Sequence, residues 1–348
     1  MCWGALFLRQ MALREPVGMK KRAKQVLLAS GVLRLAGKLR CKGAAILMYH
    51  SVTEDPRCQD IFLGGIIHSR SAFRGQMELL ARQYRPTSLE QVRRFVRGES
   101  DIPDGAVVVT FDDGYVDNYE IAAPILNEVG IPATFYVIVG CVEQGKLPWV
   151  ARLRFIFRTT KKVRWADSSG KVWPLSSEVE RDKAYLFSCD ACCKLAGLAQ
   201  EKYVACLEDE LDARVPVESG ALMLNYDQVR ELTRQGHIVG SHTMTHPNMA
   251  HVSLEEASFE MTESKKRLER QLEAAVTHFS YPCPALSPHW TEQTVAASRD
   301  AGYETAVTTD GGLARKGENP LSLNRIRPTK TVEGLRWNLE CAFARRTV

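Results

Sequence analysis

Short apolar runs alternate with amphipathic stretches over most of this 348-residue chain. The runs at 43–49, 106–111 and 131–139 are apolar and partly β-branched, as buried strands are, and 236–241 forms a shorter run of the same kind. Between them, apolar residues recur with the helical period, for example over 71–83. This alternation of strands and helices predicts an α/β fold with a parallel sheet or barrel.

Several helix boundaries are marked by capping residues. Ser88, Asn225 and Ser253 each precede an amphipathic stretch, where a side-chain oxygen can accept a backbone N–H of the first turn. A loop is expected over 53–69, and a helix over 118–130 should end at its glycine. The run at 306–309 is predicted to be the last strand.

Residues 141–220 interrupt the alternation. Apolar and aromatic residues at 163–165 and 171–173 flank a polar turn, which predicts a hairpin, and helices are expected near 177–196 and 199–213. We therefore expect an insertion into the main domain. It either stabilises the fold or forms a lid that shapes access to a site.

Charge is distributed unevenly along the chain. The whole chain carries +5, whereas residues 1–40 hold nine Lys/Arg and one acidic residue, Glu15, for a net +8. The remainder is close to −3, so the main domain is not expected to bind nucleic acid. The predicted division is a basic arm or helix over 1–42, a main domain over 43–330 and a C-terminal tail helix over 331–348.

The basic arm has two interpretations. Its apolar run is too short to span a bilayer, and Arg34 falls where a signal peptide would need an apolar core. The arm is then either a basic helix packed on the domain or an interfacial helix whose residues 19–40 contact anionic lipid. Without a secretory signal, the ten cysteines favour reduced thiols and a cytoplasmic location, with peripheral membrane contact as the second hypothesis.

One group of cysteines is tightly spaced, at Cys189, Cys192 and Cys193. A zinc knuckle would need a second pair, and Cys206 is the nearby candidate. The surrounding sequence has helical character, so we do not expect a structural metal there.

Two polar pairs directly follow predicted strands. Asp112 and Asp113 follow 106–111, and His242, with His246 four residues later, follows 236–241. The carboxyl ends of parallel strands meet at one edge of a sheet or barrel, where such folds place their sites. One carboxylate and two imidazoles can hold a zinc-like ion and leave a position for water, while the other carboxylate can take a proton. The pattern predicts a metal-dependent hydrolase, and spacing alone does not decide which aspartate ligates the ion.

The segments Thr-Phe-Asp-Asp-Gly at 110–114 and His-Thr-Met-Thr-His at 242–246 resemble two motifs of the polysaccharide deacetylases, the NodB-homology carbohydrate esterases. The order of predicted elements also matches from about residue 45 to 328. This resemblance implies a distorted (β/α)7 barrel of the NodB-homology type with an inserted α/β segment.

The resemblance also implies roles for the four polar residues. Asp113, His242 and His246 would bind one divalent ion, zinc in the first instance, with cobalt, nickel or manganese as alternatives. Asp112 would be the general base, and metal-bound water would be the nucleophile that attacks an acetyl carbonyl.

A histidine near the start of the chain has a counterpart in one branch of the family. Leu47-Met48-Tyr49-His50 resembles the Tyr-His-x-Val signature of a circularly permuted branch, in which this histidine is the general acid. Many members instead carry a histidine late in the chain, and residues 307–312 contain none. His50 is therefore predicted to be the second catalytic residue.

The third motif departs from the family pattern at 279–284, Phe-Ser-Tyr-Pro-Cys-Pro. Tyr281, Pro282 and Cys283 are predicted to contact substrate, and the Cys283 backbone N–H could face the oxyanion. No arginine lies in this motif, so the Arg–Asp pair that orients the base in some branches is expected to be absent. Pro284 replaces a glycine, which restricts the loop.

The resemblance implies removal of acetyl groups from N-acetylated sugars of a polysaccharide or a glycan precursor. The same chemistry would serve a deformylase or an O-deacetylase acting on a lipid-linked sugar, because specificity lies in the loops. A third hypothesis, suggested by Cys283 and Pro284, is a glycan-binding protein with impaired turnover.

Overall fold

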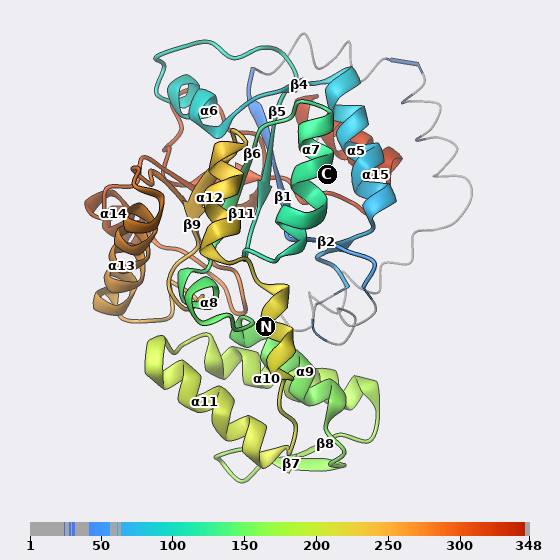
Figure 1. The fold of residues 1–348 in the computed structure, drawn as a ribbon, viewed down its shortest axis with the longest axis vertical. Helices are drawn as coiled ribbons and strands as arrows, with labels where there is room; N and C mark the ends of the chain where they lie inside the picture. The colour runs from blue at the N-terminus through green and yellow to red at the C-terminus, as the bar shows by residue number, and fades with distance from the viewer. Residues whose placement is uncertain are drawn as a thin grey trace.

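The computed structural model describes residues 42–55, 61 and 64–344, together with Lys24, Leu28, Ser30 and Gly31. Its main sheet is parallel, and Figure 1 shows helices packed around it. The strand order is β1 (Ala44–Tyr49), β5 (Ala106–Phe111), β6 (Ala133–Val137), β9 (Ile238–Ser241), β10 (His278–Ser280), β11 (Thr305–Gly311) and β12 (Leu323–Arg325). A short strand, β4 (Arg85–Pro86), pairs with β5.

The two ends of this strand order approach each other. The backbone N–H of Ile326 donates to the carbonyl of Ile46 at 2.7 Å, and the N–H of Met48 donates to the carbonyl of Ile326 at 3.1 Å. These bonds join the residue after β12 to β1 and nearly close the sheet. The predicted distorted α/β barrel with seven strands is thereby confirmed.

Side chains alternate between the two faces of each strand. On β5, Val107 and Val109 point outward into the large core shared with the surrounding helices, whereas Ala106 and Val108 point into the barrel. The inner cluster also includes side chains of α6 (Leu89–Val96), which packs against the starts of β1 and β5. This alternation carries Thr110 and then Asp112 to the inner side at the opposite end of the barrel.

Among the described residues, six helices cover the outer face and are bounded much as the sequence predicts. They are α5 (Arg70–Gln83), α7 (Ala123–Glu128), α12 (Tyr226–Arg234), α13 (Leu254–Leu272), α14 (Glu292–Asp300) and α15 (Val332–Phe343). The side chains of Ser88, Asn225 and Ser253 cap α6, α12 and α13 as predicted. The helix predicted over 118–130 is divided: a π-helical turn, η1 (Asn118–Ala122), precedes α7.

The predictions for the short strands were wrong in two places. Strand β11 was expected to be the last, but β12 follows it, and its three residues carry no apolar run that would mark a strand. The segment 53–69 was expected to be a loop, but it contains β3 (Ile67–His68), which pairs with β2 (Ser51–Val52).

The insertion has its own core and forms the lower end of the molecule in Figure 1. It begins after β6 with α8 (Val139–Gln144) and continues through the elements α9 (Trp149–Thr159), β7 (Arg164–Ala166), β8 (Val172–Pro174), α10 (Glu178–Cys192), α11 (Gly197–Glu210) and the 3-10 turn η2 (Val217–Leu222). The predicted hairpin and two helices are confirmed, whereas α9 had not been predicted. Cys189, Cys192 and Cys193 are buried in this core.

Most of the basic arm and the proposed lipid-contacting segment 19–40 lie outside the described residues, so both hypotheses stay predictions. Of the residues described there, Lys24 places its Nζ 5.3 Å from the ring centre of Trp337, and Leu28 accepts a hydrogen bond from Arg336. Both contacts are with α15, which lies within the predicted tail helix. In the part of the chain that the structure describes, no helix has the length and apolar character needed to cross a membrane.

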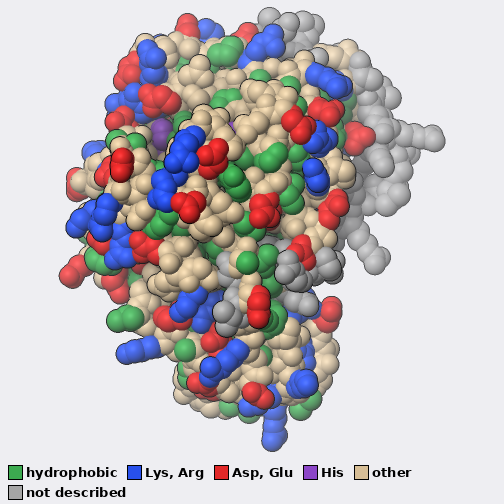
Figure 2. All heavy atoms as spheres, viewed as in Figure 1, with side chains coloured by type: hydrophobic (Ala, Val, Ile, Leu, Met, Phe, Trp, Pro, Cys, Tyr) green, Lys and Arg blue, Asp and Glu red, His purple; other side chains and the backbone are tan. Residues whose placement is uncertain are grey.

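Acidic and basic side chains are interspersed over the face of the molecule that Figure 2 shows.

Candidate active site

A pocket of about 260 Å³ lies where the barrel strands end and the insertion begins. The barrel contributes ionisable side chains to its lining: His50, Asp112, Asp113, His242 and His246. The insertion contributes Pro148, Val150, Ala151 and Tyr185 on the other side. The pocket therefore has one polar wall from the barrel and one largely apolar wall from the insertion.

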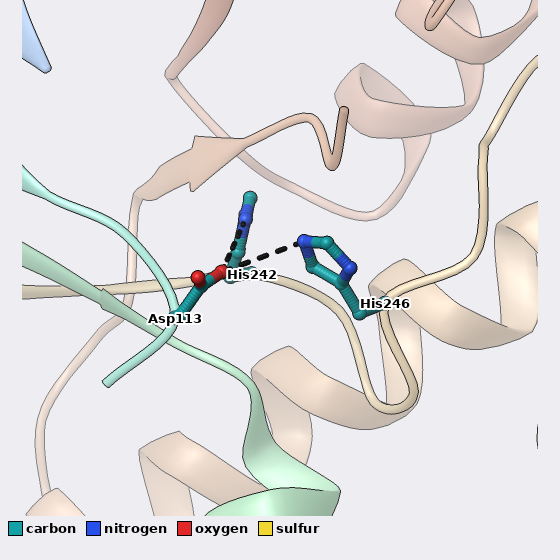
Figure 3. Close-up of side chains that lie close together, drawn as sticks. All are labelled: Asp113, His242 and His246. Carbon is teal, nitrogen blue, oxygen red and sulfur yellow. Dashed lines mark ion pairs between the residues drawn. The ribbon is translucent and has the colours of Figure 1, made fainter. Parts of the chain in front are cut away.

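Asp113, His242 and His246 converge on one point in this pocket (Figure 3). Oδ1 of Asp113 lies 3.6 Å from Nε2 of His242 and 3.5 Å from Nε2 of His246. The three ligand atoms all lie within 4.8 Å of one another, and all three residues are buried. The structure thus brings together the three residues predicted to bind a metal.

The protonation of these groups suits a cation. Burial lowers the pKa of His242 and His246, so both imidazoles are neutral at pH 7. The Ser280 carbonyl lies 2.7 Å from Nδ1 of His242, which assigns the proton to that nitrogen and leaves Nε2 as a ligand. Burial and the charge of Asp112 raise the pKa of Asp113 to about 7, against a hydrogen bond from Tyr115. A bound cation would offset the cost of burying the ionised Asp113 carboxylate, so the donor set fits a divalent ion.

The backbone at these positions is strained, which agrees with a functional role. Asp113, Thr243 and His246 have φ values of 76°, 69° and 62°, in the left-handed region that non-glycine residues rarely occupy. Gly140 packs so closely on the histidine loop that a Cβ there would lie 2.5 Å from the carbonyl oxygen of Met244.

Glu260 on α13 holds the other side of the histidine loop. Its carboxylate accepts hydrogen bonds from the backbone N–H groups of Met244 and Thr245, both at 2.8 Å, and from the Thr245 hydroxyl at 2.6 Å. Glu260 is itself almost fully buried. The loop that carries His246 is therefore fixed from two directions.

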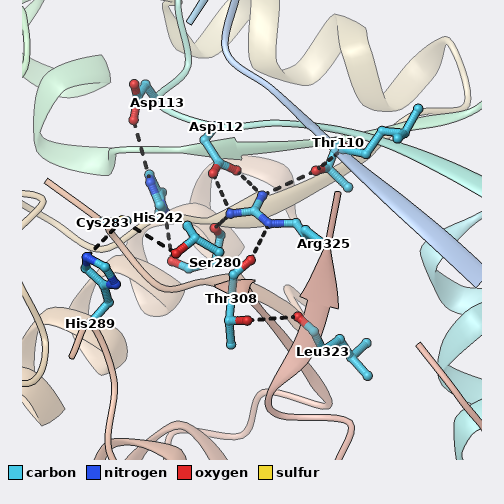
Figure 4. Close-up of polar contacts among 12 residues, drawn as sticks. Thr110, Asp112, Asp113, His242, Ser280, Cys283, His289, Thr308, Leu323 and Arg325 are labelled. Carbon is cyan, nitrogen blue, oxygen red and sulfur yellow. Dashed lines mark hydrogen bonds and ion pairs between the residues drawn. The ribbon is translucent and has the colours of Figure 1, made fainter. Parts of the chain in front are cut away.

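Asp112 is held by Arg325, which was not predicted (Figure 4). The guanidinium donates to both carboxylate oxygens, at 2.8 and 2.7 Å, and also to the Ser280 hydroxyl at 3.1 Å. Burial alone would raise the pKa of Asp112, but the charge and hydrogen bonds of Arg325 hold it well below its usual range. The expectation that no Arg–Asp pair exists was wrong, because the arginine comes from β12 rather than from the 279–284 motif.

His50 reaches the pocket from the end of β1, on the same inner side as Ile46 and Met48. The Asn118 side chain donates to its backbone carbonyl at 2.7 Å. Next to it, the Ser51 hydroxyl donates to Asp117 at 2.6 Å. Burial lowers the pKa of His50 to about 3 even though Asp112 opposes the shift. Asn118 at the start of η1 (Asn118–Ala122) and Asp117 just before it therefore hold the backbone that carries the neutral His50 imidazole.

The predicted substrate contacts are only partly in the pocket. Tyr281 points into the core, where its hydroxyl donates to Ser298 and to the carbonyl of Leu321, both at 3.1 Å. Its side chain therefore does not line the pocket, and Pro282 is also buried. Cys283 does line it, with Sγ 2.9 Å from Nε2 of His289.

Sequence reasoning missed Arg325 and Glu260 for different reasons. Arg325 lies in a strand too short to be recognised. Glu260 lies in the middle of a helix rich in charged residues, so its carboxylate does not stand out by residue type. Its helical spacing from Ala257, Ser264 and Leu268, which places it on the same face, is the signal that could have identified it as buried.

The sequence is similar to those of known deacetylases. The family model for polysaccharide deacetylase matches residues 99–174 and 198–306. YxkH of Bacillus subtilis (strain 168), whose assigned name is that of a polysaccharide deacetylase, is 22% identical over 290 residues, or 83% of this chain and 72% of that protein. The poly-beta-1,6-N-acetyl-D-glucosamine N-deacetylase of Escherichia coli (strain K12) is 36% identical over 102 residues, which is 29% of this chain and 15% of that enzyme.

Solved structures show the same fold. The deacetylase PplD of Streptococcus pyogenes, in complex with acetate, superposes with a TM-score of 0.59 at 22% identity and covers 86% of this chain and 99% of its own. IcaB from Ammonifex degensii superposes with a TM-score of 0.57 at 19% identity, covering 86% and 98%. The family model spans more than half of the chain, and its match includes both pairs of polar residues at the strand ends. The chain belongs to the polysaccharide deacetylase family.

Proposed function

We propose that this protein is a metal-dependent hydrolase that removes acetyl groups from N-acetylated sugars of a polysaccharide or a glycan precursor. The observation that carries the proposal is the convergence of Asp113, His242 and His246 beside the Asp112–Arg325 pair in one pocket. The named activity of the Escherichia coli relative supports an N-acetylated glycan as substrate.

In this proposal, Asp113, His242 and His246 hold one divalent ion, with zinc the first candidate because its ligands are typically histidines and carboxylates. When bound, such an ion supplies a Lewis acid that polarises the acetyl carbonyl and acidifies water. The contribution of the protein is a set of three ligands that leaves a coordination position free.

Asp112 takes the proton from the attacking water. Its two hydrogen bonds to Arg325 keep the carboxylate ionised and fix its orientation, so it is ready to accept a proton at neutral pH. The backbone N–H of Cys283 is proposed to donate to the carbonyl oxygen of the acetyl group as negative charge develops there.

His50 passes a proton to the departing amine as the carbon–nitrogen bond breaks, and acetate is the second product. The imidazole is neutral before the reaction, because burial lowers its pKa to about 3. As negative charge accumulates on the substrate next to it, the pKa of His50 rises and the ring takes up a proton from solvent, which it then gives to the departing amine. The proton that Asp112 removed from water returns to solvent after acetate leaves. Asn118 fixes the backbone carbonyl of His50 and thus limits where the ring can lie.

The test is acetate release from N-acetylglucosamine oligomers and from lipid-linked N-acetyl sugars, with bound metal quantified in each sample. Asp112→Asn should retain the metal and lose activity by a factor of roughly 10²–10⁴, the usual contribution of a general base. Asp113→Asn should lose both metal and activity. Asp104→Asn, an exposed aspartate just before β5, is the matched control and should retain both.

Other outcomes would select other functions. Release of formate, or of acetate from O-acetylated sugars alone, would identify the deformylase or O-deacetylase alternative. Metal binding and glycan binding without any hydrolysis would identify a binding protein, the alternative suggested by the Cys283-Pro284 departure. Failure of the wild-type protein to bind metal would overturn the proposal.

A further inference from the structure

Among the described residues that line the pocket, Arg327 is the lone Arg or Lys. It is exposed, and no hydrogen bond or ion pair joins it to another described residue. The pocket also contains His50 and His68, but burial lowers their pKa to about 3 and about 4, so both are neutral at pH 7. The positive charge that the pocket presents to a ligand is therefore that of Arg327.

The strand geometry explains how Arg327 reaches the pocket. Arg325, at the end of β12, points into the barrel and binds Asp112, whereas Ile326 points outward into the main core. Because side chains alternate, Arg327 returns to the inner side roughly 6–7 Å further along, towards the pocket opening. Arg325 and Arg327 thus have different roles. The charge of Arg325 is neutralised within the protein, whereas the charge of Arg327 is available to a ligand.

The other charges of the pocket do not offset Arg327. Asp112 is already paired with Arg325, and Asp113 is directed towards the two histidines. A divalent ion at Asp113 would leave that cluster with a positive charge as well. The pocket as a whole therefore favours an anionic ligand.

We propose that Arg327 binds an anionic substituent of the substrate, so that the protein acts on N-acetylated sugars that carry a phosphate or a carboxylate close to the acetamido group. Cys283, Pro284 and Thr309 line the pocket together with Arg327, and the insertion supplies the apolar wall. This inference rests on the proposed function, because it assumes that the pocket holds an N-acetylated sugar.

The test is a calorimetric measurement of binding, with turnover recorded separately. The probes are N-acetylglucosamine, N-acetylglucosamine 1-phosphate and a disaccharide of N-acetylglucosamine and glucuronic acid, which distinguish phosphate from carboxylate. We expect wild-type protein to bind at least one anionic probe roughly tenfold more tightly than the neutral sugar, as a charged hydrogen bond would give. Arg327→Gln should lose this preference, and Arg82→Gln, an exposed arginine on α5, should retain it.

Each measurement is made with and without the divalent ion. In one outcome, Arg327→Gln retains the preference for an anionic probe and loses it only when the divalent ion is removed. That result would show that the ion holds the anion, and it would overturn the inference. Equal affinity for charged and neutral sugars, or no binding of either, would also overturn it. A protein that binds the anionic sugar through Arg327 but releases no acetate would uphold the binding role of Arg327 and overturn the hydrolase proposal.

Discussion

The barrel end and the insertion both line the pocket, but they are built differently. The barrel contributes buried ionisable groups, of which Asp112 is held by Arg325 and His242 by the Ser280 carbonyl. The insertion contributes mainly apolar side chains and has a separate core of its own. The two regions are thus separate packing units, so substitutions in one unit should leave the other largely unchanged.

The largest effect is expected from removing Arg325. Arg325→Leu leaves the Asp112 carboxylate buried without its partner, which should lower the free energy of unfolding by about 3–5 kcal/mol. Activity should fall at least a hundredfold, because the base loses both its charge partner and its orientation. Urea denaturation and acetate release measure the two effects. Combining Arg325→Leu with Asp112→Asn should restore much of the stability but no activity, and equal losses in the single and double variants would contradict this explanation.

A core substitution in the insertion should destabilise the insertion without affecting the metal site. Leu153 is fully buried in the insertion core, and Leu153→Ala should lower the free energy of unfolding by about 2–5 kcal/mol. Hydrogen exchange should increase within 149–211, while metal content stays at the wild-type level. Leu198→Ala is the matched control, since Leu198 is 80% exposed and its loss should change stability by less than about 0.5 kcal/mol. Loss of metal from Leu153→Ala would show that the two units are not separable.

Acid should weaken the barrel before the insertion, because residues 141–220 contain no histidine. Burial lowers the pKa of His237 to about 4, below its ordinary value of 6.5. The unfolded chain therefore takes up a proton first as the pH falls, and stability that is present above pH 6.5 is lost towards pH 4. This group alone should account for roughly 2–3 kcal/mol at pH 4. Hydrogen exchange at pH 7 and pH 5 should show the larger change in β6 and β9, and a larger change in α9–α11 would count against the assignment.

A smaller effect is expected where η1 positions His50. Asn118→Ala removes the hydrogen bond to the His50 carbonyl, and kcat should fall roughly tenfold with little change in KM, since the loss concerns orientation in the reacting complex. The basic limb of the pH profile should also shift, which a purely structural defect would not cause. Asn127→Ala, an exposed asparagine on α7, serves as the control. An unchanged kcat would exclude this positioning role.

The smallest effect tests the direct link between the two regions. The indole N–H of Trp149, at the start of α9, donates to the backbone carbonyl of His246 at 2.9 Å. Trp149→Phe should weaken metal binding by a factor of a few, in line with about 0.5–1.5 kcal/mol for one hydrogen bond. Trp173→Phe removes an indole N–H that bonds Asp167 within the hairpin, so its metal affinity should stay unchanged. Equal effects in the two variants would mean that this link is not specific.

The sequence predicts those parts of the site that lie beside strongly marked strands. Asp112 and Asp113 follow the apolar run of β5 directly, and the histidines follow β9, so strand periodicity alone brings them to one edge. Asp112 and Arg325 are 213 positions apart in the sequence, and Arg325 lies in a three-residue strand. No local pattern therefore predicts their contact. The insertion helix α9 was missed because it buries Arg152, whose charge is neutralised by Glu201 and Glu208 from another helix. Because Arg152 is charged, the sequence did not indicate that its position in α9 is buried.

The closure of the barrel between β1 and the residues after β12 has a consequence for biosynthesis. Synthesis proceeds from the first strand to the last, so His50 and the three proposed metal ligands leave the ribosome before Arg325 does. A nascent chain therefore contains the three proposed metal ligands and the proposed base before Arg325 is available to pair with Asp112. A chain that ended before residue 325 would lack both this partner of Asp112 and the strand through which the barrel closes onto β1.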